Sequence, residues 1–219
     1  FLLSGNMNPF EVLSIAEDYR IEVCEKKHSY SIPVQTEVER IWKKEKEARG
    51  DALYNGKLLS LLSMDATCLV GEVVDYKHFL AQHSDPSLFE KIKIVPVAVT
   101  GIVSVENKYL IGKRSKRVLT HQGLMEFVPS GGVEQGIMQS GTLYPSQQLL
   151  LELFEETGME LTVVEAITPF AVIKQGIQGP VDICAHIRLN PQALQHAAFP
   201  ANEHLFFEWK TKEELYHDI

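Results

Sequence analysis

The chain has 219 residues, of which 45% are hydrophobic, and a formal net charge of −8 at pH 7. This length and apolar content suffice for a buried core in one domain, or in a domain with an N-terminal appendage. The acidic balance argues against a nucleic-acid partner, because proteins that bind nucleic-acid backbones non-specifically carry a basic field. It still allows a small basic pocket.

The cysteines and the apolar runs exclude further classes. Cys24, Cys68 and Cys184 are widely spaced and contain no Cys-x-x-Cys pair, so the sequence indicates neither a zinc site nor a disulfide framework. No apolar run approaches the ~20 residues of a membrane span. The residues before Met7 lack the basic region and apolar core of a signal peptide. We therefore expect a cytoplasmic protein without a membrane partner.

The first third of the chain predicts a small α+β unit. Ile21 and Val23 alternate with polar residues as in a half-buried strand, and Asn55-Gly56 marks a turn. The expected elements are a strand at 19–26, a helix at 37–49, strands at 57–64 and 67–76, and a short helix at 77–82. This unit is interpreted first as a packing appendage to the next domain, with a dedicated substrate or dimer element as the alternative.

The polar stretch 83–87 is the expected domain boundary. The expected units are an N-terminal tail at 1–18, the small unit at 19–92 and a larger domain at 93–219. In the larger domain, a β-branched run at 95–105, a turn at Glu106-Asn107 and a strand at 109–112 predict a hairpin.

A basic run follows this hairpin. Lys113, Arg114, Lys116 and Arg117 are four of five consecutive residues. Such a run is usually a solvated face or a loop, but beside a phosphate site it would bind the phosphate.

Further strands are expected at 161–174 and 181–189. In the second strand Asp182, His186 and Arg188 share one face; a His and an Arg there are most often simply exposed, but facing a phosphate pocket they would contact substrate. The chain then predicts a short helix at 191–198, a closing strand at 202–209 and a helix at 211–215.

Three carboxylates interrupt the helical pattern that ends at Gly158. Glu152, Glu155 and Glu156 share an arc of roughly 100° on a helix, where their repulsion costs a few tenths of a kcal/mol per pair. The residues expected to face the core from the opposite side are Leu150, Leu153 and Phe154. Such a run is often only a solvated acidic face, but three oxygen ligands on one helical face also suit Mg²⁺ or Mn²⁺.

The stretch resembles the signature of the Nudix hydrolases, Gly-x5-Glu-x7-Arg-Glu-U-x-Glu-Glu-x-Gly-U with U apolar. The residues in register are Glu152, Leu153, Glu155, Glu156, Gly158 and Met159, and Gly131 fits the opening glycine. The resemblance covers about 94–215 and implies an α/β fold: a Nudix-type α/β/α sandwich with a mixed sheet, here preceded by the small α+β unit. The order of the whole chain is also similar to the UDP-glucose diphosphatase branch of the family.

Two departures from the signature concern how its carboxylates are held. The family's arginine is Leu151 here, its earlier glutamate falls on Ile137, and extra residues are inserted within 135–145. The family's arginine orients the neighbouring glutamate, so its loss leaves Glu152 less firmly held. Because Leu151 adjoins other leucines, we expect it to pack into the core and to leave Glu152 unbraced. The alternative is that Lys113, Arg114, Lys116, Arg117 or Arg188 reaches Glu152.

The resemblance implies hydrolysis of a nucleoside diphosphate linked to another moiety, such as a nucleotide sugar. Glu152, Glu155 and Glu156 would hold Mg²⁺ or Mn²⁺ in one cleft, and Glu152 or Glu203 would accept a proton from the attacking water. The residues expected to contact substrate are Arg114, Lys116, Arg117, His186 and Arg188. A homodimer is compatible with this function. The alternative is a non-catalytic Nudix-fold module that binds a nucleotide or a protein, which the loss of the arginine and of the earlier glutamate favours.

Overall fold

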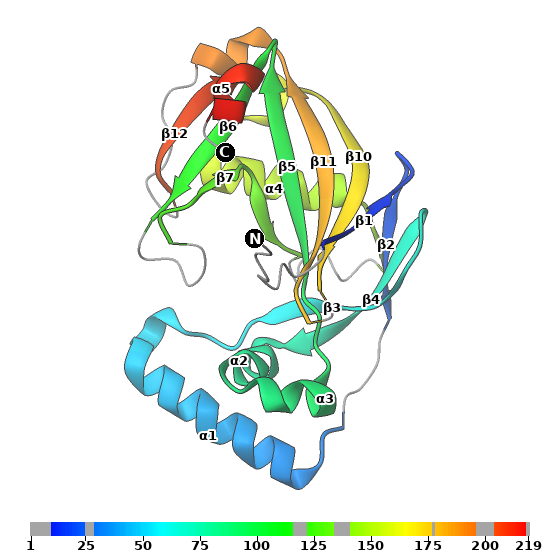
Figure 1. The fold of residues 1–219 in the computed structure, drawn as a ribbon, viewed down its shortest axis with the longest axis vertical. Coiled ribbons are helices and arrows are strands. Elements are labelled where there is room, and N and C mark those ends of the chain that lie inside the picture. Colours follow the sequence, from blue (N-terminus) through cyan, green and yellow to red (C-terminus); the bar gives the residue numbers. More distant parts are fainter. Residues whose placement is uncertain are drawn as a thin grey trace, which may run out of the picture.

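Two mixed β-sheets and the helices that pack on them make up the molecule (Figure 1). The structure is a computed structural model, and it describes residues 10–24, 29–115, 122–133, 141–176, 178–195 and 204–217. The predicted class, α/β with a mixed sheet, is confirmed. None of the described helices is long and apolar enough to cross a membrane.

The larger sheet has the strand order β1-β10-β11-β5-β6-β12. Its strands are β1 (Phe10–Ser14), β10 (Val164–Gln175), β11 (Val181–Leu189), β5 (Val97–Val105), β6 (Lys108–Arg114) and β12 (His204–Thr211). Two short strands lie off this path: β7 (Met125–Phe127) pairs with β6, and β8 (Ser130–Gly132) pairs with β5. β11 and β5 are parallel, and the other pairs are antiparallel.

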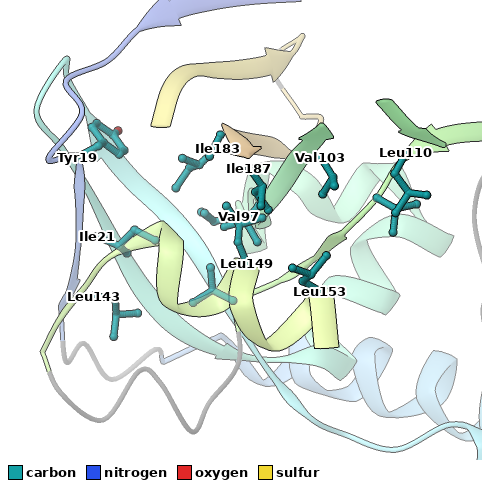
Figure 2. Close-up of a cluster of buried hydrophobic side chains, with 14 of the residues drawn as sticks. Tyr19, Ile21, Val97, Val103, Leu110, Leu143, Leu149, Leu153, Ile183 and Ile187 are labelled. Carbon is teal, nitrogen blue, oxygen red and sulfur yellow. The ribbon is translucent and has the colours of Figure 1, made fainter. Parts of the chain in front are cut away.

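One face of this sheet is covered by the helix that carries the three glutamates, α4 (Pro145–Thr157). Leu149 and Leu153 of α4 pack into the main hydrophobic cluster with strand residues such as Val97 and Ile187 (Figure 2). Figure 2 also shows Tyr19 in the same cluster, although it comes from the N-terminal third of the chain.

The smaller sheet has the order β3-β4-β2-β9. Its strands are β3 (Lys57–Met64), β4 (Cys68–Asp75), β2 (Arg20–Cys24) and β9 (Thr142–Leu143). The helices beside it are α1 (Ile32–Arg49), α2 (Tyr76–Ser84) and α3 (Phe89–Ile92). A second hydrophobic cluster joins them, with Val38 of α1, Val74 of β4 and Ala81 of α2 among its members.

Among the described residues, two strand pairs and the isolated bridge between Ser60 and Pro96 cross the expected domain boundaries. β1 lies in the segment expected to be a tail, yet it pairs with β10 of the larger sheet. β9 lies in the insertion between Gly131 and Leu151, and it pairs with β2 of the smaller sheet. The division at residues 18 and 92 stays a prediction, but it does not separate two sets of strands.

Most predicted elements are confirmed with shifted ends. The helix expected at 37–49 begins at Ile32 because Pro33 lies in its first turn, where the missing N–H costs no helical hydrogen bond. Glu106 takes a left-handed φ of 53° in the predicted hairpin turn. The segments expected to begin a strand at 161 and a helix at 191 instead form 3-10 turns. Within the described ranges, the 3-10 helices are Gly50–Ala52, Pro86–Leu88, Leu161–Val163 and Pro191–Gln195. The last described helix is α5 (Lys212–His217).

Candidate functional site

The limits of α4 follow from residues at both ends. Pro145 occupies the first turn, and the side chain of Gln147 accepts a hydrogen bond of 3.0 Å from the backbone N–H of Tyr144. At the other end Gly158 takes a left-handed φ of 69° and its N–H donates to the carbonyl of Phe154. Glycine adopts this conformation without a Cβ clash, so the helix stops directly after its carboxylates.

The face that α4 buries differs from the predicted one. Leu153 is buried as expected, but Leu150 is only half-buried and Phe154 is 56% exposed. Gln148 and Glu156 are buried in their place. The apolar pattern gave the wrong face because both polar side chains form hydrogen bonds in the interior. These bonds offset the free-energy cost of burying a polar group.

Glu152 lies against the glycine that opens the signature. The side-chain amide of Gln148 donates a 2.7 Å hydrogen bond to Oε1 of Glu152 from one turn earlier in the helix. A Cβ added at Gly131 would overlap the carboxylate of Glu152. A side chain at position 131 would therefore displace the carboxylate of Glu152 from its place beside β8.

Glu156 is turned towards the same strand. It is 8% exposed, and its Oε1 accepts a 3.0 Å hydrogen bond from the backbone N–H of Ser130. Its Oε2 lies 3.8 Å from Nδ1 of His204. Glu152 and Glu156 thus face consecutive residues of β8, Gly131 and Ser130.

The predicted convergence of all three carboxylates is not seen. Glu155 is exposed, while Glu152 and Glu156 turn towards β8. Among the described residues, no three His, Cys, Asp or Glu side chains lie close enough together to hold a metal ion. The helix therefore brings two of the three predicted ligands to one place.

These two carboxylates still fit a hard divalent cation by their chemistry. Mg²⁺ and Mn²⁺ prefer oxygen ligands, and Mg²⁺ is commonly bound through one or two carboxylates together with substrate phosphates. The carboxylate of Glu152 fills the place that a side chain at position 131 would take. A third carboxylate from α4 would require Glu155 to turn inward.

The expectation that Leu151 packs into the core is wrong. Its side chain is 41% exposed. Leu149 and Leu153 define the core stripe, and Leu151 is two residues, or about 200° around the helix, from Leu149. Nor is Glu152 unbraced, since the neutral amide of Gln148 donates to it.

Arg114 has an acidic partner that sequence reasoning missed. Its Nη1 donates to both carboxylate oxygens of Glu126, at 2.7 and 2.9 Å. Nε2 of His204 is 2.7 Å from Oε1 of the same carboxylate. Burial alone would raise the pKa of the Glu126 carboxyl, but the hydrogen bonds from His204 and Arg114 outweigh it and hold this pKa below its usual value.

The sequence contains only weak indications that Arg114, Glu126 and His204 lie together. Glu126 precedes the Gly-Gly turn and His204 follows Glu203, so both lie within segments that resemble the family. Their pairing joins β7 and β12 through β6 across distant parts of the chain, which no local spacing encodes.

The structure places His186 and Arg188 away from the carboxylates of α4. His186 lies 2.7 Å from Oγ of Ser104 on β5, and Arg188 donates to Glu165 at 2.9 Å. Ile187, between them, packs into the cluster that α4 covers, so both polar side chains point to the other face of the sheet.

The predicted site residues Lys116, Arg117 and Glu203 lie outside the described residues, as does Ile137 of the signature comparison. Their predicted roles therefore stay predictions.

Comparison with known proteins gives likenesses of fold. No family model and no curated protein matches the chain. Protein DR0079 of Deinococcus radiodurans aligns with a TM-score of 0.48 and 20% identity, over 73% of this chain and 86% of that one. A NUDIX-family hydrolase from Clostridium perfringens aligns at 0.40 and 15%, over 55% and 84%. A bifunctional NMN adenylyltransferase/ADP ribose pyrophosphatase from Francisella tularensis, complexed with AMP and a Mn ion, aligns at 0.41 and 17%, over 65% and 43%. In its signature residues and in its fold, the chain is similar to the Nudix hydrolases.

Proposed function

We propose that the chain is a metal-dependent pyrophosphohydrolase that cleaves the diphosphate of a nucleoside diphosphate linked to another moiety, such as a nucleotide sugar. The observation that carries this proposal is the approach of Glu152 and Glu156 to consecutive residues of β8, with Gly131 lacking a Cβ where the carboxylate of Glu152 lies. This packing brings together three residues of the signature: its opening glycine, Gly131, and two of its glutamates, Glu152 and Glu156.

In this mechanism the chain mainly positions the cation, the diphosphate and the attacking water. A bound Mg²⁺ or Mn²⁺ would neutralise charge on the diphosphate and lower the pKa of a bound water. Glu152 and Glu156 would hold this cation, joined by Glu155 if it turns inward. Glu152 or Glu203 would accept the proton of the attacking water.

The basic residues at and just beyond the end of β6 divide between two roles in this proposal. Arg114 forms an ion pair with Glu126. Lys116 and Arg117 remain the candidates for contact with the substrate phosphates, because a basic side chain there would stabilise the charge that develops on the leaving group.

The second candidate is a non-catalytic module that binds a nucleotide or a protein partner. Two observations favour it: an exposed Leu151 stands where the signature has arginine, and the described residues contain no cluster of three metal-binding side chains. Binding without turnover would follow if the carboxylates cannot gather around a cation.

The experiment that separates the two is a screen of nucleoside diphosphate sugars and dinucleotides with Mg²⁺ or Mn²⁺. Phosphate released after phosphatase treatment reports the cleavage. We expect turnover that requires the metal and falls at least ~100-fold in Glu156→Gln, the size of effect seen when one stabilising contact to a transition state is removed. Glu160→Gln, which changes an exposed glutamate beyond the helix, is the matched control.

The Glu156→Gln variant should fold normally. The amide oxygen of glutamine still accepts the hydrogen bond from Ser130, and a negative charge is removed from an acidic helix. No turnover of any compound by the parent protein, together with saturable binding of a nucleotide in calorimetry, would establish the binding module instead.

A further inference from the structure

A cavity of about 870 Å³ lies between the start of α1, the end of β4 and the first turn of α2. Its volume falls within the range of small-molecule sites in proteins, about 300–1,000 Å³. No described residue of its lining belongs to α4 or β8, and Figure 1 shows α1 and α2 at the lower end of the molecule, away from α4. The cavity is therefore separate from the site of Glu152 and Glu156.

Part of the lining is aromatic. The rings of Tyr30 and His78 are in contact, with centroids 4.7 Å apart and planes tilted by 35°, and both residues line the cavity. The side chain of Gln35 donates a 2.7 Å hydrogen bond to the backbone carbonyl of Tyr30 and so ties it to α1. Val38 and Val74 line the same cavity and belong to the second hydrophobic cluster. Rings held in this way against an apolar base can stack on another planar ring.

Both rings are uncharged near neutral pH. Burial, with smaller contributions from the carboxylates of Glu72 and Asp75, raises the pKa of the Tyr30 hydroxyl to about 12. Burial also lowers the pKa of His78 below its ordinary value, because the imidazolium loses more hydration than the neutral ring; the charge of Asp75 opposes this shift. The two rings are therefore suited to recognise a ligand by stacking and not by charge.

The charged residues of the lining occur as two ion pairs. Lys57 of β3 bonds Asp75, the residue opposite it on β4, and Lys77 of α2 bonds Glu39 of α1. An ammonium group has three donor protons and a carboxylate about four acceptor sites, so each pair can still hydrogen-bond a ligand. The pairs cancel in formal charge, so they offer donors and acceptors without the net positive charge that would attract a phosphate.

We propose that this cavity binds a neutral planar heterocycle with hydrogen-bonding edges, such as the base of a nucleoside. The heterocycle would stack on Tyr30 and His78, and its edge would exchange hydrogen bonds with the two ion pairs of the lining. A phosphate adds nothing to recognition here, since it would compete with the carboxylates that already hold both lysines. The proposal does not depend on the proposed function, and a ligand bound here is distinct from the substrate of the hydrolase.

Titration of the full chain with adenosine, guanosine, cytidine and uridine tests the proposal. Amide chemical shifts measured by NMR locate the bound nucleoside, and EDTA in the buffer prevents metal-dependent binding at α4. We expect at least one nucleoside to bind saturably and to shift the amide resonances of Thr36 and His78, which line the cavity, while those of Ser130 and Gly131 stay unchanged. The monophosphate of the same nucleoside should bind no more tightly than the nucleoside itself.

Two leucine variants test the aromatic part of the lining. Tyr30→Leu and His78→Leu each remove one ring and keep an apolar side chain. Because each loses a stacking partner of the base, we expect binding of the nucleoside to weaken at least ~5-fold in either variant. His83→Leu is the matched control: it changes an exposed histidine of the same helix and should bind the nucleoside with the parent affinity. Circular dichroism checks that each variant is folded.

Three results would overturn the proposal: no binding of any of the four nucleosides, shifts confined to Ser130 and Gly131, or parent affinity in both folded leucine variants. Binding of a monophosphate without binding of its nucleoside would also overturn it, because recognition would then rest on the phosphate. If one leucine variant does not fold, the other gives the comparison, and the chemical shifts of the parent protein test the site without either. None of these readouts needs turnover, so failure of this site leaves the hydrolase proposal intact, and absence of turnover leaves this test valid.

Discussion

Gly131 and Gly132 are adjacent in sequence, but the space where a Cβ would lie is occupied at Gly131 and open at Gly132. A Cβ at Gly131 would overlap the carboxylate of Glu152, whereas a Cβ at Gly132 would meet nothing within 4 Å. We therefore expect Gly131→Ala to push Glu152 away from β8 and to lower metal-dependent turnover by at least ~10-fold. Gly132→Ala should leave turnover nearly unchanged. Steady-state kinetics on both variants measures the difference, and equal losses would show that the approach of Glu152 to β8 has no functional role.

Leu151 gives a test of activity at an exposed position. Because its side chain is 41% exposed, Leu151→Arg should change the free energy of unfolding by no more than about 0.5 kcal/mol, as is usual for surface substitutions. The guanidinium would add a positive charge near Glu155, one turn later in the helix. We expect turnover to rise, measured on the best substrate of the screen. A stable variant without any gain would mean that the missing arginine does not limit this chain.

At the residue scale, the signature spacing located the glutamates of α4 but not their surroundings. Glu156 is buried where its carboxylate accepts a hydrogen bond from the N–H of Ser130 and lies beside the ring of His204, and both partners come from other elements. Helical periodicity sorts side chains by polarity, so it placed Phe154 inside and Glu156 outside. A polar group that finds partners in the interior reverses that order.

At the element scale, β3 and β4 are held by a close contact at Gly71. A Cβ at Gly71 would lie 2.7 Å from Cγ of Leu59, which is fully buried. Gly71→Ala should therefore overpack this pair and lower the free energy of unfolding by about 1–3 kcal/mol. Urea denaturation gives the value.

The matched control for this contact is a double-mutant cycle. Leu59→Ala removes the atoms that the new Cβ would meet, so Gly71→Ala should cost much less in that background. Additive effects of the two substitutions would instead place the cost of Gly71→Ala in the backbone of β4 and not in its contact with Leu59.

The strands that alternation predicts are those with one buried face. β11 was found because its odd-numbered residues are apolar and buried, from Val181 to Leu189. β1 was missed because Phe10 and Val12 are exposed and the strand lies at the edge of the sheet. The parallel pairing of β2 with β4 was also beyond the sequence, since partners in a parallel pair are set by tertiary packing.

At the scale of the whole molecule, the two hydrophobic clusters share their supporting strands. β4 contributes Leu69 to the main cluster and Val74 to the second. The buried side chain of Gln82 on α2 bonds both backbone groups of Ile94, at 2.7 and 2.9 Å, just before β5. Composition along the chain indicated a boundary at the polar stretch 83–87 and a small unit ending at 92, but it could not show that packing continues across this region.

We therefore expect the molecule to unfold as one cooperative unit. The chain has two tryptophans, and they report on different parts: Trp42 lies on α1, and Trp209 of β12 packs against the main cluster. Trp209→Phe leaves only the signal of Trp42, and Trp42→Phe leaves only that of Trp209. In urea, the fluorescence midpoint of each variant should coincide with its own midpoint by far-ultraviolet circular dichroism, because unfolding of α1 and α2 would expose β4 and remove the partners of Ile94. A Trp42 signal that changes at clearly lower urea, while most of the secondary structure persists, would show instead that the segment around residues 19–92 unfolds as a separate domain.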